Sequence, residues 1–341
     1  MTRTNQIKPI TIRDLARMAG VSVATISRVL NNQQGVSEKT RTRIKQLIEE
    51  TNFKPSEKAR NFFRGDTKTI GLVIPRPDEY VFSNPFYLDI LRGAVEASSK
   101  VKYNLLLVTS EKDSFTFLFH EQHVDGVIII SYPKNDYVIM KLIEEELPFV
   151  LLSSLISNQP FNQIDIDDFA AAKKVIEYLI SLGHKRIAFI GCPIKVASGY
   201  YRLEGYRQAL ANNGISFNEN LVTTSEIPLS NVGAESVERI LKGNPDTTAF
   251  FAFNDLVAIG AIGALREKGY MPGKDISVVG FDDIFSSKYT YPPLTTVRQS
   301  GYDKGWLAVE RLLEVINGDR EKKRIILETS LIIRDTCHKV N

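Results

Sequence analysis

From residue 69 onward, short apolar runs alternate with longer amphipathic stretches, and this alternation constrains the fold of the chain more than any other feature. The pattern predicts strands at 70–75, 104–109, 126–131, 149–153, 186–191, 248–253 and 277–281. It predicts helices at 87–100, 138–146, 170–182, 202–213, 232–242, 255–268 and 302–317. Such alternation indicates an α/β fold, in which parallel sheets are covered by helices on both faces.

The alternating region is long enough for two such sheets, and we expect the break between them near 165–168. Residues 292–297 should cross back to the first lobe, where helix 302–317 packs, and a last strand is expected at 325–333. Open α/β sheets bind ligands beyond the carboxyl ends of their strands. We therefore expect a ligand cleft between the two lobes.

The net charge of +3 conceals an uneven distribution along the chain. Residues 1–66 hold 13 Lys or Arg and 6 Asp or Glu, a net charge of +7, whereas residues 67–341 hold 30 and 34, a net charge of −4. A basic segment joined to a mildly acidic body is typical of a protein that binds a polyanion with one end only.

The basic segment has the pattern of a helix-turn-helix. Thr11 and Asp14 suit the start of a first helix, Gly20 suits the turn, and Ser22 suits the cap of a second helix. Ser37 opens a third helix. We expect Val23, Ala24, Ser27 and Arg28 to point outward from the second helix and enter the major groove, where Arg28 can bind a guanine edge. Ser22, Asn31 and Ser37 suit phosphate contacts.

The segment Thr-Ile-Arg-Asp-Leu-Ala-Arg-Met-Ala-Gly-Val-Ser-Val-Ala-Thr-Ile-Ser-Arg-Val-Leu-Asn at 11–31 resembles the head of the LacI/GalR family of bacterial transcription repressors. The similarity continues through 36–41 and 52–55 and then along nearly the whole chain. It implies a bilobal core like that of periplasmic sugar-binding proteins. The stretch around Asn84-Pro85-Phe86 is similar to maltose-type repressors of Gram-positive bacteria.

Between head and core, the resemblance implies a hinge helix that folds on operator DNA. A helix of about nine residues is marginal in water, so this segment needs a partner to fold. Ala59 and Phe62 match the positions that enter the minor groove, and Phe62 stands where the family usually has leucine. Two alternatives are packing of Phe62, or of Phe63, against the body. Residues 110–123 form a shorter segment than the family has.

The resemblance also implies effector-binding residues. Arg202, in Arg-Leu-Glu-Gly-Tyr, and Asp282, in Gly-Phe-Asp-Asp, match the family's motifs and can bind sugar hydroxyls. Asn254 matches an Asn-Asp pair in which Asp255 is expected to cap the next helix. In the first lobe, Phe86 can stack on a sugar ring, and Ser131 and Ser153 lie at strand ends. The structural alternatives are an ion pair for Arg202, a helix cap for Asn254, a turn for Asp282, the core for Phe86 and loops for the serines.

Signs of catalysis are weak, and we expect no enzyme, no cofactor and no metal site. No nucleophile elbow, P-loop or dinucleotide motif is present. His120 and His123 suit a solvated helix face, while His184 and His338 are distant in sequence. Asp167 and Asp168 precede a helix and suit capping.

We therefore expect residues 1–55 to be a helix-turn-helix head, 56–66 a hinge helix and 67–341 the core. The first lobe should comprise 67–165 and 298–327, and the second 166–297 and 328–341. The expected function is a cytoplasmic homodimeric repressor of a carbohydrate operon, controlled by a sugar or sugar phosphate. One alternative is a catabolite-control regulator with a phosphorylated protein corepressor. A more distant one is a sugar-binding transport protein.

The uneven charge leads to a test with salt. We expect operator affinity to fall steeply with salt, because a basic head releases counterions from DNA, while effector binding to the body changes far less. Titrations of DNA and of effector at two salt concentrations measure both slopes. Equal slopes would contradict this division of labour.

Overall fold

The computed structural model describes residues 10–30, 33–51, 53, 67–109, 118, 123–130, 137–152 and 161–340. The chain divides into two compact units, Met1–Lys68 and Thr69–Asn341, called here the head and the body. Five residues expected to contact DNA or effector lie outside the described residues: Asn31, Ala59, Phe62, Ser131 and Ser153. Most of the segment 110–123 also lies outside them.

The described part of the head contains three helices: α1 (Ile12–Ala19), α2 (Val23–Leu30) and α3 (Glu38–Glu50). A capping box opens α1, in which the Thr11 hydroxyl oxygen accepts from the Asp14 N–H and the Asp14 carboxylate accepts from the Thr11 N–H. Gly20 ends this helix in the left-handed conformation, with φ of 66°. The helix start and the turn predicted from the sequence are thus confirmed. Leu15, Ile26 and Ile44, one from each helix, are fully buried.

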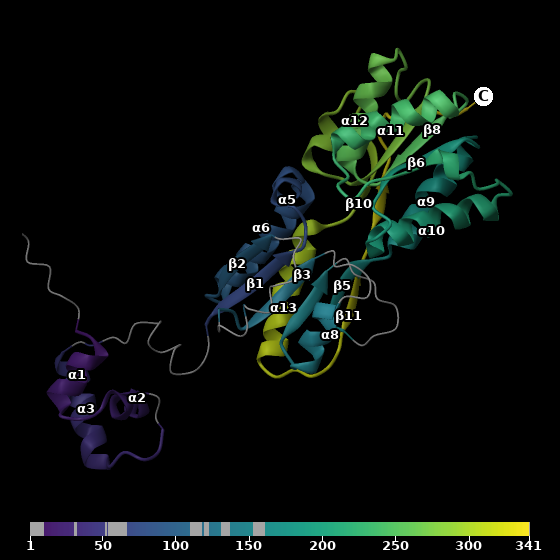
Figure 1. The fold of residues 1–341 in the computed structure, drawn as a ribbon. Helices are drawn as coiled ribbons and strands as arrows, with labels where there is room; N and C mark the ends of the chain where they lie inside the picture. The colour runs from purple at the N-terminus through teal and green to yellow at the C-terminus, as the bar shows by residue number, and fades with distance from the viewer. Residues whose placement is uncertain are drawn as a thin grey trace, which may run out of the picture. The chain divides into compact units, whose positions relative to one another are not determined.

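Six parallel strands form the first sheet of the body, in the order β11-β5-β4-β3-β1-β2 (Figure 1). Their bounds are Thr69–Ile74 (β1), Asn104–Thr109 (β2), Gly126–Ile130 (β3), Phe149–Leu152 (β4), Gln163–Ile166 (β5) and Arg324–Leu327 (β11). Its helices, among the described residues, are α5 (Asp78–Ser83), α6 (Pro85–Lys100), α8 (Tyr137–Glu144) and α13 (Gly301–Ile316). Side chains of α6 and α13 cover one face of the sheet, and those of α8 pack on the other.

The second sheet has the order β12-β10-β9-β8-β6-β7, and its edge strand β12 is antiparallel to β10. Its strands are Ile187–Cys192 (β6), Val222–Thr224 (β7), Ala249–Ala252 (β8), Ser277–Asp282 (β9), Thr295–Arg298 (β10) and Ser330–Ile332 (β12). Its helices are α9 (Asp168–Ser181), α10 (Ala197–Asn212), α11 (Ser230–Gly243) and α12 (Asp255–Glu267), with short 3-10 turns at Glu219–Leu221 and Phe285–Tyr289. One apolar core lies on each face, towards α9 and α10 and towards α11 and α12.

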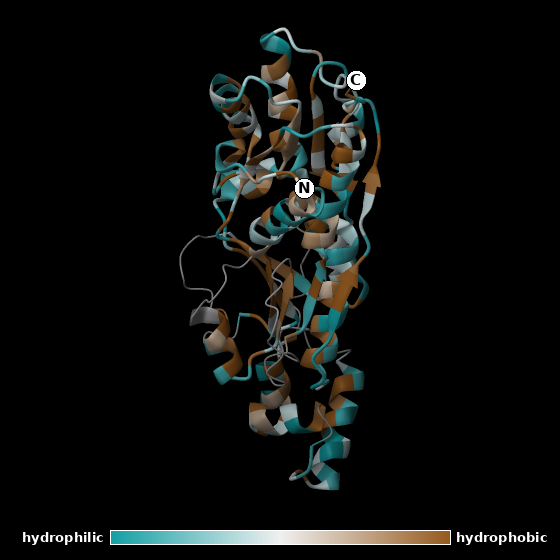
Figure 2. Ribbon diagram, turned by 90° about the vertical axis from the view of Figure 1, so that its right-hand side faces the viewer, coloured by the Kyte–Doolittle hydropathy of each residue, from teal (hydrophilic) through white to brown (hydrophobic). Residues whose placement is uncertain are grey.

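Hydrophobic residues are concentrated on the strands of both lobes (Figure 2). Helices α6 and α13 of the first lobe approach closely because a glycine on each helix faces the backbone of the other. A Cβ built on Gly93 of α6 would lie 2.0 Å from the Tyr302 carbonyl oxygen, and one on Gly305 of α13 would lie 2.0 Å from that of Ile90. This contact joins α13, late in the chain, to the first lobe.

The chain passes between the lobes three times, after β5, after β10 and after β11. The expected crossing at 292–297 is wrong, because Thr295–Arg298 pairs with β9 as a strand of the second sheet. The expected single strand at 325–333 is also wrong. Its two halves, β11 and β12, belong to different sheets, since this extended segment spans both lobes. Within the described residues, none of the helices combines the length and the apolar character that a membrane crossing needs.

A buried histidine joins the end of the chain to the second lobe. His184 is fully buried, and its ring nitrogens lie 2.9 Å from the Thr248 hydroxyl and 2.8 Å from the Ser277 hydroxyl. The same Ser277 hydroxyl lies 3.1 Å from Nδ1 of His338, whose ring meets that of His184 edge to face. Two histidines that are 154 positions apart therefore lie in one cluster.

Burial, and then the charge of His338, lower the pKa of His184 to about 4. In the unfolded chain the His184 ring has its ordinary pKa of about 6.5. The contribution of neutral His184 to stability is therefore complete above that pH. It is lost as the pH falls towards about 4, at up to about 1.4 kcal/mol per pH unit. We expect His184→Gln to flatten the decline of stability between about pH 7 and about pH 5, measured by urea unfolding.

His123→Gln, at an exposed position, should leave the pH profile of the wild type unchanged. This comparison between variants is needed because buried carboxyls elsewhere in the body titrate in the same range. An identical profile for His184→Gln and the wild type would refute the role of His184.

Candidate functional site

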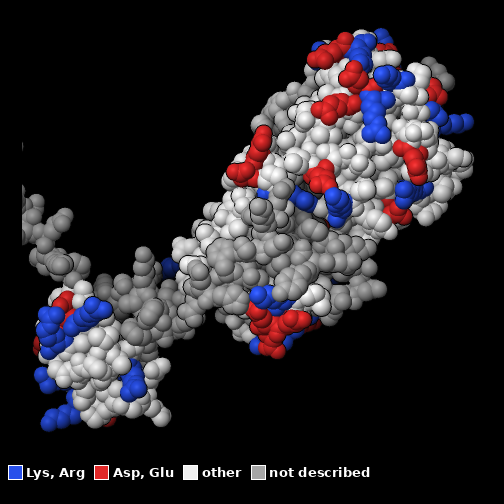
Figure 3. All heavy atoms as spheres, in the orientation of Figure 1, with Lys and Arg blue, Asp and Glu red and all other residues white. Residues whose placement is uncertain are grey.

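The outward side of α2 presents side chains that were expected to contact DNA. Ser22, Ala24 and Arg28 are exposed, while Val23 is half-buried and packs against the core of the head. The Ser22 hydroxyl oxygen caps the helix by accepting from the Thr25 N–H at 3.1 Å. Basic side chains predominate on the face of the head seen in Figure 3. An exposed helix with an arginine and small apolar side chains suits entry into a major groove.

Ser27 does not point outward as predicted, because only 7% of it is exposed. It follows Val23 by one helical turn, and Val23 already packs against the core, so this flank of α2 turns inward. Ser37 is exposed and caps α3, where its hydroxyl oxygen accepts from the Thr40 N–H at 3.3 Å. The accessible candidates on α2 are therefore Val23, Ala24 and Arg28, together with Ser22 just before the helix.

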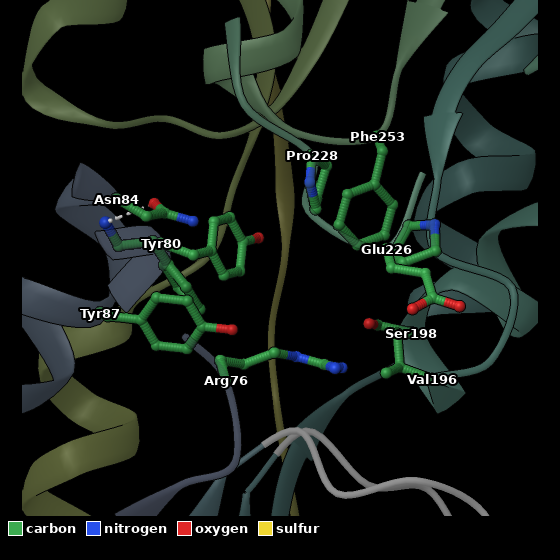
Figure 4. Close-up of a pocket in the computed structure, with 11 residues that line it drawn as sticks. Arg76, Tyr80, Asn84, Tyr87, Val196, Ser198, Glu226, Pro228 and Phe253 are labelled. Atoms are coloured by element: carbon green, nitrogen blue, oxygen red, sulfur yellow. Dashed lines mark hydrogen bonds between the residues drawn. The ribbon is translucent and has the colours of Figure 1, made fainter. Parts of the chain in front are cut away.

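A cavity between the two lobes of the body provides the candidate ligand site (Figure 4). It encloses about 470 Å³ of empty space, part of which is open to solvent. The first lobe contributes Arg76, Tyr80, Asn84, Phe86 and Tyr87. The second lobe contributes Pro193, Val196, Ser198, Glu226, Pro228 and Phe253. Both lobes thus line one site, at the carboxyl ends of their parallel strands.

Aromatic side chains form much of the first-lobe wall. Tyr80 lies on α5, directly after β1, and meets Tyr87 edge to face with ring centres 5.6 Å apart. Burial, and then the charges of Tyr87 and Asp282, raise the pKa of Tyr80, which keeps its hydroxyl neutral. Asn84 caps α6 by accepting from the Phe86 N–H at 3.1 Å, which places Phe86 in the first turn of the helix beside the cavity.

Arg202 lies behind the second-lobe wall and is 4% exposed. Its Nε donates to the Asp168 carboxylate at 2.7 Å, and one terminal nitrogen donates to the Phe253 carbonyl oxygen at 2.6 Å. Its guanidinium also lies 3.4 Å from the centre of the Phe281 ring. Asp168 was expected to cap α9, which is wrong: Asp167 caps that helix, and Asp168 is buried against Arg202 instead.

Asn254, and not Asp255, caps α12. Asn254 caps α12 by accepting from the Val257 N–H, and its amide donates to the Pro228 carbonyl oxygen. Asp255 is fully buried and does not cap the helix as predicted. Its carboxylate accepts from the Ile284 N–H and from the hydroxyls of Ser287 and Thr296, so it joins the start of α12 to the segment after β9, to the 3-10 turn and to β10. Burial, and then the charge of Asp282, raise its pKa to about 8.

Asp282 begins a chain of buried polar groups that reaches the first lobe. Its carboxylate accepts from the Gln299 amide at 2.6 Å, and the Gln299 carbonyl oxygen accepts from the Lys304 ammonium at 2.8 Å. Lys304 in turn lies 3.8 Å from the Asp165 carboxylate. Burial raises the pKa of Asp282 to about 6, which the charge of Arg202 partly offsets. Gln299 stands where the chain leaves β10 for the first lobe.

Of the expected effector residues that are described, Phe86 lines the cavity, and Arg202, Asn254 and Asp282 lie behind or beside its second-lobe wall. The expected ligand contacts of these residues remain predictions. The sequence reasoning missed Tyr80, Tyr87, Ser198 and Glu226, and the partners Gln299 and Lys304. The predicted strand at 70–75 was a signal that could have indicated Tyr80, whereas β7, the strand before Glu226, is not evident in the sequence.

Removal of Arg202 should destabilise the body even without a ligand, because the buried Asp168 carboxylate would lose its ion-pair partner. We expect Arg202→Ala to lower the free energy of unfolding by about 3–5 kcal/mol in urea. The double variant Asp168→Asn/Arg202→Met should recover most of this loss. Arg207→Ala, which breaks a half-exposed pair with Glu204 on the same helix, should cost about 1 kcal/mol or less. A single variant as stable as the wild type would contradict the pairing.

Comparison with known proteins identifies the family. The family model for bacterial regulatory proteins of the lacI family matches residues 11–56, and the model for the periplasmic binding protein-like domain matches 176–337. The chain is 32% identical to the transcriptional regulator MalR of Clostridium butyricum, over 96% of this chain and 99% of that protein.

Two solved structures have the same fold over nearly the whole chain. A complex of the transcriptional regulator CelR with cellobiose has a TM-score of 0.75 and 31% identity, covering 96% of this chain and 99% of that one. The lac repressor dimer bound to operator and an anti-inducer has a TM-score of 0.78 and 28% identity, covering 97% and 100%. The fold and the resemblance expected from the sequence are confirmed, and the chain belongs to the lacI family of bacterial regulatory proteins.

Proposed function

We propose that this regulator represses a carbohydrate operon as a cytoplasmic homodimer whose two heads bind a near-palindromic operator. A sugar-like effector in the cleft of the body then changes operator affinity. The observation that supports this most is the presence, in one chain, of a basic helix-turn-helix head and a cavity lined by both lobes of the body. The solved relatives point the same way, since one binds cellobiose and another is a dimer on its operator.

The proposed division of the chain is a head at 1–55, a hinge helix at 56–66 and a core at 67–341. Within the head, we assign DNA contacts to Ser22, Val23, Ala24, Arg28, Asn31 and Ser37. Within the hinge, we assign the minor groove to Ala59 and Phe62. Arg28 is exposed at the end of α2, where bidentate hydrogen bonds to a guanine edge are geometrically possible.

The proposed switch acts through the angle between the lobes. Three chain crossings connect them, and side chains of both line the cavity, so a ligand that contacts both sides favours one relative angle. The ligand alters operator affinity only as far as it binds the two states unequally, typically about 1–3 kcal/mol of coupling. The angle between the lobes would favour or oppose the pairing of the two hinge helices on DNA.

An enzymatic function has less support. Arg202 and Asn254, behind the cavity wall, are held by a buried ion pair and by a helix cap, and neither belongs to a pair of nucleophile and adjacent base. A transport component would have no use for a basic helix-turn-helix head. A regulator accounts for both parts of the chain.

We expect Phe62→Ala to weaken specific operator binding about tenfold, because the wedge that opens a base step is lost. Phe63→Ala is the matched control, since it removes the same side chain one position away and should leave affinity near that of the wild type. Both affinities are measured by mobility shift on an operator selected from random DNA by the purified protein. Equal affinities for Phe62→Ala and the wild type would refute the assignment of the wedge.

A further inference from the structure

The basic residues of α3 in the head differ in exposure. Lys39, Arg43 and Lys45 are exposed. By contrast, only 13% of the Arg41 side chain is accessible. The stem of an arginine is often covered while its charged end stays in water, so the bonds of the guanidinium itself decide what Arg41 does.

The Arg41 guanidinium is engaged on two sides. One of its terminal nitrogens donates to the Gln33 carbonyl oxygen at 2.7 Å. Its Nε lies 3.6 Å from the Glu38 carboxylate, three positions earlier on the same helix. Because Gln33 lies between α2 and α3, Arg41 connects α3 to the segment that precedes it. The planar fork of an arginine presents its donors in fixed directions, which a lysine ammonium does not.

The Gln33 peptide is also bonded to the end of α2. Its N–H donates to the Arg28 carbonyl oxygen at 2.9 Å, and Arg28 stands in the last turn of that helix. The last four carbonyl oxygens of a helix have no partner within it, so this bond satisfies one of them. The two bonds of the Gln33 peptide therefore join α3 to the turn of α2 that carries Arg28.

The same segment also reaches the side chain of Arg28. A Cβ built on Gly35 would lie 4.0 Å from a terminal nitrogen of Arg28. Gly35 has φ of 93°, a conformation that other residues rarely adopt. The backbone at Gly35 thus lies alongside the Arg28 guanidinium, and a different course of the segment 33–36 would change the space in which that guanidinium rests.

Direction matters for the contact that Arg28 is proposed to make. Bidentate hydrogen bonds to a guanine edge need the guanidinium in one plane with the base. A mobile arginine loses side-chain entropy when it is fixed in that plane. A constraint on the last turn of α2, and on the backbone beside Arg28, reduces the number of alternative orientations before DNA binds.

We propose that Arg41 is a positioning residue for DNA recognition. Through the Gln33 peptide it fixes the last turn of α2 and the segment beside Arg28, and so it increases the preference for the base pair that Arg28 contacts. Arg41 itself touches neither base nor phosphate. This inference rests on the proposed function, because it takes the contact of Arg28 with a base edge as given.

The test compares Arg41→Lys with the wild type in the full chain. Affinities are measured for an operator selected from random DNA, for its single-base variants and for unrelated DNA. We expect Arg41→Lys to lower the ratio of operator affinity to affinity for unrelated DNA about tenfold, because the charge remains but the fixed geometry is lost. Arg43→Lys, at an exposed position of the same helix, should keep the ratio of the wild type. An unchanged ratio in Arg41→Lys would overturn the inference.

The operator position that is affected separates positioning from a general loss of structure. Arg28→Ala should relax the preference at one base pair of each half-site, and Arg41→Lys should relax the same base pair. In a chain that already carries Arg28→Ala, Arg41→Lys should change the ratio by less than about twofold, since the side chain that it positions is gone. Equal losses in both backgrounds, or an even loss at all operator positions, would show a merely structural role and overturn the inference.

A second variant leaves the bond from Arg41 to Gln33 in place. Glu38→Gln removes only the carboxylate beside the Arg41 Nε, so the head keeps its connection between α2 and α3. We expect it to relax the same base pair about twofold, as the loss of an exposed ion pair allows. Relaxation at a different base pair would contradict the inference.

The dependence of operator affinity on salt tests whether Arg41 binds a phosphate instead. Loss of one phosphate contact reduces the slope of log affinity against log salt by about one. Arg41→Met should therefore keep the slope of the wild type. A slope reduced by about one would assign Arg41 to the DNA backbone and overturn the inference.

Arg28→Ala separates this inference from the proposed function. If it leaves the preference at every operator position unchanged, the proposed contact of Arg28 is wrong, and the role of Arg41 fails with it. If it relaxes a base pair that Arg41→Lys leaves intact, the contact of Arg28 stands and the present inference alone is wrong.

Discussion

The body depends on the burial of charged side chains where its two lobes meet. An unpaired charge in such a place costs several kcal/mol, so each carboxylate and each cation there needs a partner at a fixed position. Arg202 satisfies this need by joining α10 to the start of α9 and to the end of β8. Lys304 does so by joining α13 to β5 and to the crossing segment at Gln299. The ends of strands, the starts of helices and the crossings are positioned together by these few bonds.

The backbone at the end of β9 also needs hydrogen-bond partners at fixed positions. Asp282 and Asp283 have φ of 114° and 57°, a region that costs a non-glycine residue about 1–3 kcal/mol. Hydrogen bonds from Gln299 to Asp282, and from Arg298 and Arg334 to Asp283, hold both residues there. The Asp282 carboxylate, behind the second-lobe wall of the cavity, therefore also fixes a crossing between the lobes through its bond to Gln299.

The sequence predicts the central strands and the long helices well, because each is a continuous apolar run or a clear amphipathic stretch. It does not reveal β5, β7 or α5, which are only three to six residues long, and β5 carries a glutamine and an aspartate. Motifs indicated Arg202, Asn254 and Asp282, but not what they bond to. Asp168, Gln299 and Lys304 are charged or polar residues that any surface helix or loop could hold. Only the tertiary structure shows that they are buried together.

The charge of the chain is divided between its two units. Where the lobes of the body meet, three buried carboxylates, Asp165, Asp168 and Asp282, face two buried cations, Arg202 and Lys304. Residues 67–341 carry a net charge of −4, while residues 1–66 carry +7. A body of this sign is repelled by the phosphate backbone, so electrostatic attraction to DNA has to come from the head and hinge.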